Sequence, residues 1–256
     1  MSNIKKFRIK KFKTNEAILK LKKLSFKFGK KIILDDFNIS LNKGQILGLL
    51  GPNGVGKSTI FNLIIGNLIP DFGSIIIENQ KINKYPTFQR ALKYKIGYVP
   101  QIGGYFQNLT VFENMKAIAE ININEIRYQE EKINSLITKF ELETISNVKA
   151  AFLSGGQKKK LVIALSLISN PKILLLDEPF AALDIMTIKN LQETIVELQR
   201  SANISIILCD HQARDLLACV DTAAIIHNGK VIAQDTPNSL LQNLEAKKFY
   251  FGETFR

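Results

Sequence analysis

The sequence has few cysteines and no long apolar run. Its two cysteines, Cys209 and Cys219, are too few for a disulfide framework and do not have metal-site spacing, so we expect packing residues in a reduced, cytosolic setting. Apolar runs such as ILLL at residues 173–176 fall far short of the roughly 18 residues of a membrane-spanning helix, and they suit buried strands. The start of the chain lacks the apolar segment of a secretory signal. These shortages argue against a secreted protein, a protein with a cysteine-ligated metal site and a membrane-spanning protein.

Acidic residues are also scarce relative to basic ones. The chain has 35 Lys and Arg against 23 Asp and Glu, which gives a formal net charge of +12. Residues 1–23 hold nine of the basic residues and a single acid, Glu16. We interpret residues 1–20 as a solvated basic extension, with an anionic membrane surface or nucleic acid as the alternative partners of such a tail.

The rest of the composition is ordinary for a globular protein. With 256 residues, of which 46% are hydrophobic and 23% charged, the chain can bury a full core. We expect one large domain, or one domain with a subdomain.

A glycine-rich loop follows a short apolar segment. Residues 44–50, GQILGLL, predict a buried strand, residues 51–59, GPNGVGKST, match G-x-x-x-x-G-K-[ST], and a helical pattern follows. Glycines let backbone N–H groups approach phosphates, Lys57 supplies a cation, and Ser58 supplies a hydroxyl for Mg²⁺. A chance match in a glycine-rich turn is the alternative, which the flanking strand and helix disfavour. The predicted nucleotide-binding residues of this loop are Gly51, Pro52, Asn53, Gly54, Val55, Gly56, Lys57, Ser58 and Thr59.

Two carboxylates follow a second apolar segment, KILLLDEPF at residues 172–180. Asp177 lies where the end of a parallel strand meets a phosphate site, and its carboxylate can hold Mg²⁺ through water. Glu178 is a candidate base to orient and polarise an attacking water. The alternative is that this pair merely caps the next helix.

The two histidines have different predicted roles. His211 ends a third apolar segment, ISIILCDH at residues 204–211, at the strand edge where it can contact a γ-phosphate. His227 lies beside an Asn-Gly turn between apolar runs, which predicts a hairpin with His227 as a surface strand residue.

A mostly helical stretch, residues about 110–170, is predicted to be inserted between the first and second strands of the nucleotide core. Thr110 and Glu113 match a capping box at its start. Just before it, Gln101 lies on a Pro/Gly-rich loop where its amide can contact metal or water. The stretch LSGGQKKK at residues 153–160 opens the last helix with a second anion-binding pattern, which can lie far from the first in space.

These motifs, taken together and in this order, resemble the ATP-binding subunits of ABC transporters over residues about 21–250. The set is GPNGVGKS, Gln101, LSGGQ, ILLLDE, AALD at residues 181–184, and His211. The resemblance implies an α/β P-loop NTPase core with an inserted α-helical subdomain, about residues 105–168, an antiparallel β element and a C-terminal segment, residues 238–256. It also implies ATP and Mg²⁺ as cofactors and a head-to-tail dimer.

Residue roles follow from the same resemblance. Glu178 and His211 are the implied catalytic residues. The implied metal ligands are Ser58, Gln101 and Asp177. Phe28 is implied to stack on adenine, with Phe26 as the alternative, and Gln101 is implied to contact the nucleotide as well. The implied contacts with the nucleotide of the opposite subunit are the signature residues Ser154, Gly155, Gly156 and Gln157. Asp184 is implied to lie at the dimer interface and is counted among the nucleotide-binding residues.

The chain departs from the family pattern near the signature. Val162 and Leu165 occupy positions where relatives usually carry Glu and Arg, which puts coupling details in doubt. Ile185 replaces the usual Pro after AALD, a milder change in turn stiffness.

The ending KKFYFGETFR, residues 247–256, and residues 210–237 resemble the ATP-binding subunits of lipopolysaccharide-export transporters. Branched-chain amino-acid importers share the GYVPQIGG stretch, and a soluble ABC-type ATPase acting on nucleic acid or ribosomes is a further alternative. The resemblance implies a homodimer, with a pair of related subunits as the alternative, on the cytoplasmic face of the inner membrane. The protein is expected to be peripheral and to bind no nucleic acid. Integral membrane subunits are expected to contact residues about 101–115, with Phe106 as the exposed anchor; Tyr105, Leu109 and Phe112 are apolar neighbours that can instead pack the subdomain.

Overall fold

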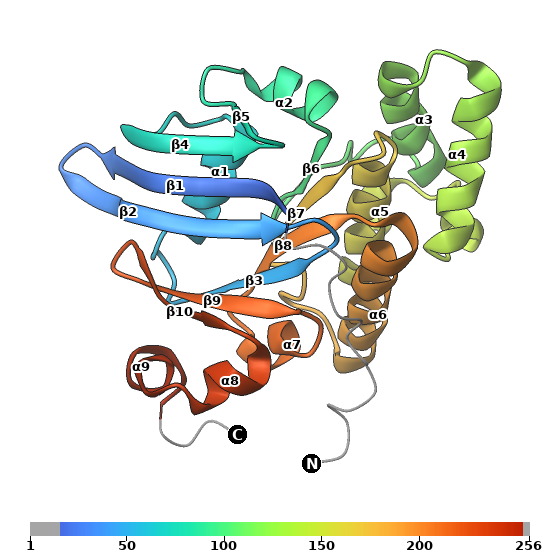
Figure 1. The fold of residues 1–256 in the computed structure, drawn as a ribbon. Coiled ribbons are helices and arrows are strands. Elements are labelled where there is room, and N and C mark those ends of the chain that lie inside the picture. Colours follow the sequence, from blue (N-terminus) through green and yellow to red (C-terminus); the bar gives the residue numbers. More distant parts are fainter. Residues whose placement is uncertain (1–15, 253–256) are drawn as a thin grey trace.

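The computed structural model describes residues 16–252, which form two sheets surrounded by helices (Figure 1). The central sheet has six strands in the order β10-β9-β3-β8-β7-β6, and the second sheet has four in the order β2-β1-β4-β5. The strands are β1 (Ala17–Phe28), β2 (Lys31–Asn42), β3 (Ile46–Leu50), β4 (Phe72–Ile77), β5 (Gln80–Lys81), β6 (Ile96–Val99), β7 (Ile173–Asp177), β8 (Ser205–Cys209), β9 (Thr222–His227) and β10 (Lys230–Asp235).

The central sheet is parallel except at one edge. Strands β3, β6, β7, β8 and β9 run parallel, and β10 pairs antiparallel with β9. Every residue of β3, β7 and β8 is buried, as expected for strands covered on both faces. Because these strands are parallel, their carboxyl ends form one edge of the sheet and their amino ends the other.

Helices cover the central sheet on both faces. The helices are α1 (Lys57–Ile65), α2 (Thr87–Lys93), α3 (Val111–Asn122), α4 (Ile126–Lys139), α5 (Gly155–Leu167), α6 (Ile185–Ala202), α7 (Ala213–Leu217), α8 (Pro237–Gln242) and α9 (Leu244–Ala246), with short turns η1 (Glu143–Ile145), η2 (Ala150–Phe152) and the π-helical η3 (Lys247–Phe251). One apolar cluster joins α1 to both sheets, and a second joins α3–α6 to the opposite face. Figure 1 shows α3 and α4 as a hairpin standing out at one side.

The fold is the predicted α/β P-loop type with an antiparallel element, and the capping box at Thr110 and Glu113 is confirmed. The predicted place of the helical insertion is wrong. It enters between β6 and β7, and β6 is itself a central strand that lies after β3 in the chain. The four residues of β6 are too short a run to stand out by periodicity next to a Pro/Gly-rich loop.

The ends of the chain are described only in part. Strand β1 begins at Ala17, inside the range assigned to the basic extension, because residues 17–28 pair with both β2 and β4. Residues 1–15 of the extension and residues 253–256 of the C-terminal segment lie outside the described residues. Within residues 16–252, none of the helices combines the length and the apolar character needed to span a bilayer.

Candidate active site

The glycine-rich loop connects β3 to α1 at the carboxyl edge of the central sheet. Gly56 is the N-cap of α1 at φ 108°, and no side chain caps the first turn. A Cβ at Gly51 would stand 2.6 Å from the Ile226 carbonyl oxygen, and one at Gly56 would stand 2.9 Å from Ile33 Cγ2. Glycine is therefore required at both positions, and the loop keeps free backbone donors at a helix start, the arrangement that binds phosphate.

Lys57 is a buried cation at the end of this loop, where α1 begins. Its Nζ donates to the carbonyl oxygens of Gly51 at 2.7 Å and Pro52 at 3.1 Å. Burial lowers the pKa of Lys57, an effect opposed by the nearby Cys209, Glu178 and other acids. An ammonium group has three N–H donors, so the side chain can hold the loop closed and still donate to a phosphate.

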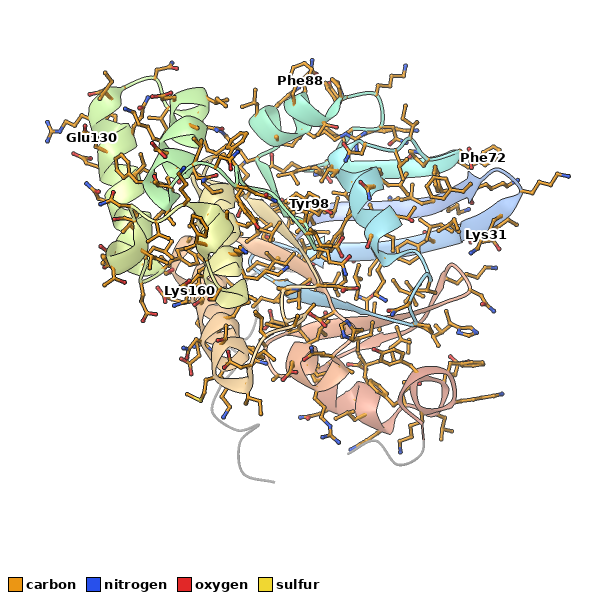
Figure 2. All side chains as sticks on the ribbon, turned by 180° about the vertical axis from the view of Figure 1, so that it is seen from behind. Lys31, Phe72, Phe88, Tyr98, Glu130 and Lys160 are labelled. Carbon is orange, nitrogen blue, oxygen red and sulfur yellow. The ribbon has the colours of Figure 1, made fainter. Side chains whose placement is uncertain are left out.

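Asp177 closes β7 and is surrounded by hydrogen-bond donors. Ser58 Oγ donates to Oδ1 at 3.3 Å, Cys209 Sγ donates to the same oxygen at 2.9 Å, and Tyr98 Oη donates to Oδ2 at 3.2 Å. Burial, and then the charge of Asp177, raise the pKa values of Tyr98 and Cys209. Tyr98 is half-buried and lies near the middle of the view in Figure 2. The carboxylate is thus fixed in place before any ligand arrives.

Tyr98 and Cys209 were both missed as site residues. The sequence prediction for Cys209 was packing, and burial is confirmed for both cysteines, yet the Cys209 thiol also contacts Asp177. The position of Cys209, two residues before His211 at the end of an apolar strand, was the available signal.

The residues present fit a magnesium ion. Ser58 and Asp177 bring a hydroxyl and a carboxylate oxygen together, the hard donors that Mg²⁺ prefers. Within residues 16–252, no three His, Cys, Asp or Glu side chains are grouped to hold a metal on their own. A Mg²⁺ at this place would be bound through the Asp177 carboxylate together with substrate phosphates and water.

Glu178 sits on the turn leaving β7 in a strained conformation. Its φ is 47°, the left-handed region that non-glycine residues rarely occupy, and its N–H donates to the Cys209 carbonyl at 2.8 Å. Gln101 Nε2 donates to Glu178 Oε2 at 2.6 Å, and His211 Nδ1 lies 3.7 Å from the same oxygen. The fold thus brings together three of the predicted residues from three separate segments.

Two further charged residues support this cluster and were not predicted. Asp210 is fully buried and accepts from the backbone N–H groups of Phe180 and Gln212, both at 2.9 Å, which ties the turn after β7 to the turn after β8. Lys159 Nζ donates to the Gln101 carbonyl at 3.1 Å. Burial lowers the pKa of Lys159, and Asp210 and Asp177 oppose that shift. The lysine run after LSGGQ was the sequence signal for Lys159.

The signature segment forms the N-terminus of α5, as expected. Ser154 is the N-cap, its Oγ accepts from Gln157 N–H at 3.3 Å, and Gln157 Oε1 accepts from Ser154 N–H at 2.9 Å. Among the described residues, no hydrogen bond or ion pair joins residues 153–157 to residues 51–59. A Cβ at Gly156 would approach Thr187 Cγ2 to 2.8 Å, so the signature packs against the start of α6.

Phe28 and Phe26 differ sharply in burial. Phe26 is a core residue at 7% exposure, whereas Phe28 is 53% exposed at the β1–β2 turn, with the two rings edge to face. Phe28 is therefore the one available for stacking.

Asp184 is the N-cap of α6, and its hydrogen bonds from Thr187 lower its pKa.

His227 is not a simple surface residue. The predicted β9–β10 hairpin is confirmed, but His227 is half-buried and its ring lies 4.8 Å from that of Phe249 in η3. The C-terminal segment, which the sequence did not place in space, covers it.

The stretch after Gln101 has one clearly exposed aromatic side chain. Phe106 is 55% exposed, and its backbone is held by the buried Asn114 side chain through hydrogen bonds at 2.7 and 3.0 Å. Tyr105 and Phe112 pack against the apolar cluster below. Val162 and Leu165, the two departures from the family pattern, are both buried in that cluster.

Comparisons with known proteins identify relatives of this chain. The sequence profile of the ABC transporter family matches residues 34–181. The lipopolysaccharide export system ATP-binding protein LptB of Escherichia coli K12 is 36% identical over 241 residues, 94% of this chain and 99% of that protein. The structure of a nucleotide-free ATP-binding cassette from an ABC transporter superposes with a TM-score of 0.83 at 28% identity, covering 93% of this chain and all of the other.

A second solved structure shows a nucleotide state. The dimeric post-hydrolysis structure of the ATP-binding cassette MJ0796, bound to ADP and Pi, superposes with a TM-score of 0.76 at 26% identity, covering 86% of this chain and 98% of that one. The family match spans more than half of the chain, and it includes the glycine-rich loop, Asp177 and Glu178. The chain belongs to the ABC transporter family and is an ATP-binding subunit of the ABC ATPase type.

Proposed function

We propose that this chain is the ATP-hydrolysing subunit of a lipopolysaccharide-export transporter and acts as a homodimer beneath integral membrane subunits. The observation that carries this proposal is the 36% identity to LptB, which extends over 94% of the chain rather than the nucleotide motifs alone. The proposed location is the cytoplasmic face of the inner membrane, as a peripheral protein without nucleic acid.

In the proposed mechanism, the glycine-rich loop and Lys57 hold the β- and γ-phosphates of ATP. Ser58 and Asp177 would hold Mg²⁺, with the amide oxygen of Gln101 as a third ligand, and the ion would neutralise charge on the phosphates. Tyr98 and Cys209 keep Asp177 in one orientation through their hydrogen bonds.

Glu178 is the proposed general base, which takes a proton from the attacking water. Its neighbours are suited to that task, because Gln101 and His211 both face Oε2 and fix the carboxylate. His211 is proposed to contact the γ-phosphate, and Phe28 to stack on adenine.

The second half of each site is proposed to come from a second copy of the chain. The start of the signature helix, with Ser154 as its N-cap, makes no hydrogen bond to the glycine-rich loop within the described residues. This supports the proposal that the signature of another copy completes the γ-phosphate site. Asp184 is proposed to lie at the dimer interface, where its place at the start of α6 fixes its orientation. The structure of MJ0796 bound to ADP and Pi is dimeric.

The proposed contact with the membrane subunits is residues about 101–115, with Phe106 as anchor. This stretch follows Gln101 directly, so a change at the nucleotide site is proposed to reach the membrane subunits through it. An aromatic anchor that becomes buried in an interface typically costs on the order of 2 kcal/mol when truncated.

The test is purification of the full chain from its native membranes, with identification of the membrane proteins that accompany it. The proposal expects the integral subunits of a lipopolysaccharide exporter; subunits of a branched-chain amino-acid importer, or RNA with nucleic-acid-stimulated ATPase, would overturn it. Phe106→Ala should lose this assembly while its ATP binding is retained. Phe72→Ala is the matched control, since Phe72 is 70% exposed on β4, away from the 101–115 stretch.

A further inference from the structure

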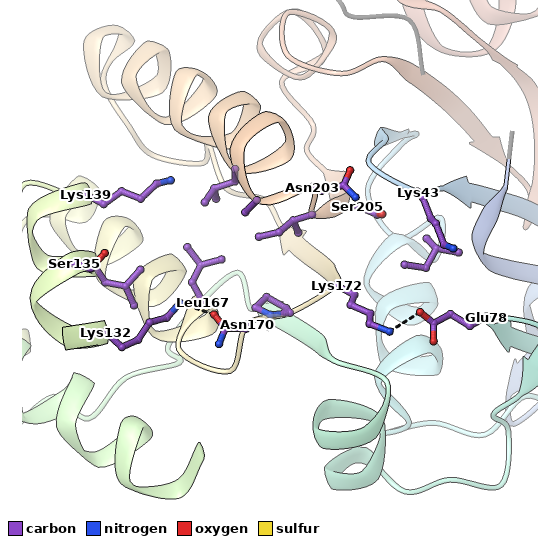
Figure 3. A pocket seen from close by; sticks show the side chains of 16 residues that line it. Lys43, Glu78, Lys132, Ser135, Lys139, Leu167, Asn170, Lys172, Asn203 and Ser205 are labelled. Carbon is purple, nitrogen blue, oxygen red and sulfur yellow. Dashed lines mark hydrogen bonds and ion pairs between the residues drawn. The ribbon is translucent and has the colours of Figure 1, made fainter. Parts of the chain in front are cut away.

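A cavity of about 650 Å³ opens at the amino edge of the central sheet, between α4 and the core (Figure 3). Lys172 directly precedes β7, and Ser205 opens β8, so both line the side opposite to Asp177. With a rise of about 3.3 Å per residue, the length of β7 alone separates the two edges by roughly 13 Å. This amino-edge cavity is therefore distinct from the nucleotide site.

Positive charge dominates the walls of the amino-edge cavity. Among its lining residues, the charged side chains are Lys43, Lys132, Lys139, Lys172 and one acid, Glu78. The lysines come from separate elements: Lys132 and Lys139 lie on α4, Lys172 lies before β7, and Lys43 lies before β3. Their charges converge on one space only because the chain folds.

Lys132 is a half-buried cation without a carboxylate partner in the part of the chain that the structure describes. Its Nζ donates to Asn170 Oδ1 at 2.6 Å, a neutral acceptor (Figure 3). Burial lowers the pKa of Lys132, and the positive charge of Lys139 lowers it further. An anion in the cavity would relieve both effects.

The other lysines have partners that leave them able to bind a ligand. Lys139 pairs with Glu197 at 3.1 Å, and Lys172 pairs with Glu78 at 2.6 Å; all four side chains are at least 26% exposed. Exposed pairs of this kind contribute little, about 0–1 kcal/mol each. Each ammonium keeps two further N–H donors after bonding one carboxylate, so an anion can be bound without breaking the pair.

We propose that the amino-edge cavity binds a multiply charged, phosphate-bearing anion, held by Lys132 and Lys139 from α4 and by Lys172 from the core. The apolar lining residues Leu136 and Leu167 beneath these lysines accommodate a carbon framework attached to the phosphate. A bound anion bridges α4 to the core and stabilises the helical hairpin against the sheet. A soluble phosphate metabolite and the headgroup of an anionic lipid share this chemistry.

The test uses the full chain with its nucleotide site saturated by Mg-ADP. Because ADP then occupies the glycine-rich loop, the added anion cannot bind there. Pyrophosphate is titrated by calorimetry at constant ionic strength, and vesicles with and without phosphatidylglycerol are tested by co-sedimentation. The cavity variant is Lys132→Gln with Lys139→Gln. The control is Lys84→Gln with Lys116→Gln, which removes the same charge from exposed positions that do not line the cavity.

The proposal expects pyrophosphate, the vesicles or both to bind the wild type and the control alike. The cavity variant should lose affinity on the order of ten-fold or more, because charged hydrogen bonds are lost. Pyrophosphate binding alone identifies a soluble source, and vesicle binding alone identifies a lipid headgroup. Equal binding by both variants, or no binding of either probe to the wild type, overturns the proposal. Unfolding midpoints without anion verify that both variants fold.

Discussion

The charged side chains at the two edges of the central sheet differ in burial and in their partners. At the carboxyl edge, Asp177 and Asp210 are almost completely buried, and each accepts at least two hydrogen bonds from the protein. At the amino edge, lysines stand in partly exposed pairs around an open cavity. The first edge is rigid and organised in advance for one reaction. The second is adaptable, because its pairs can exchange partners at low cost.

The largest effect is expected from Glu178→Gln at the carboxyl edge. Glutamine keeps the size and the contact with Gln101 but removes the proposed base, so hydrolysis should fall by roughly 10²-fold or more while ATP still binds. Steady-state ATPase assays and nucleotide-binding titrations measure the two effects, and ATP-bound dimers should accumulate in size-exclusion chromatography. Near-normal hydrolysis would rule out Glu178 as the base.

A second carboxyl-edge change, Lys57→Ala, should act on binding instead of chemistry. The variant lacks the cation that is proposed to bind the phosphates, and nucleotide affinity should fall on the order of ten-fold or more. The same variant also removes the hydrogen bonds to Gly51 and Pro52, so its melting temperature must be measured in parallel. An unchanged dissociation constant in a folded variant would contradict the assignment.

Asp221 differs from the partly exposed charged pairs at the amino edge, because it is a buried acid. Its carboxylate accepts from Ile46 N–H at 2.7 Å at the start of β3, and burial raises its pKa from 3.8 to about 6. The folded state then binds the proton more tightly than the unfolded state, so the stabilising effect of protonation is lost as the pH rises from about 4 to 6.

Asp221→Asn tests how the charge of Asp221 affects the stability of the fold. The amide still accepts from Ile46 but carries no charge, so the variant should gain stability relative to the wild type, by roughly 1–3 kcal/mol, between pH 4 and pH 7. Urea unfolding at several pH values measures the difference. If the two stability profiles stay parallel, Asp221 does not titrate in this window.

The smallest effect is expected from Glu197→Gln, which breaks the pair with Lys139. The side chains are 26% and 62% exposed, so unfolding free energy should change by less than about 1 kcal/mol. Urea unfolding again gives the value. A loss of several kcal/mol would show that the amino edge is as rigidly organised as the carboxyl edge, and the contrast between the two edges would fail.

The carboxyl edge could be predicted well from the sequence because its residues lie in contiguous motifs. The glycine-rich loop, the Asp177–Glu178 pair and His211 each follow an apolar strand, and parallel strands bring their carboxyl ends together. Tyr98, Lys159 and Asp210 were missed, since each contacts the site only through the packing of β6, α5 and β8. Strand β6 itself was too short to recognise, which misplaced the helical insertion.

The sequence alone determined the reaction class of this protein, since a phosphate loop and its strand-end acids are local patterns fixed by backbone geometry. Tertiary structure alone decided the surroundings: which donors hold Asp177, that Glu178 faces Gln101 and His211, and that lysines from residues 43, 132, 139 and 172 share one cavity. These contacts join residues far apart in the chain, and their distances depend on how helices pack on the sheet. No spacing in the sequence records that packing.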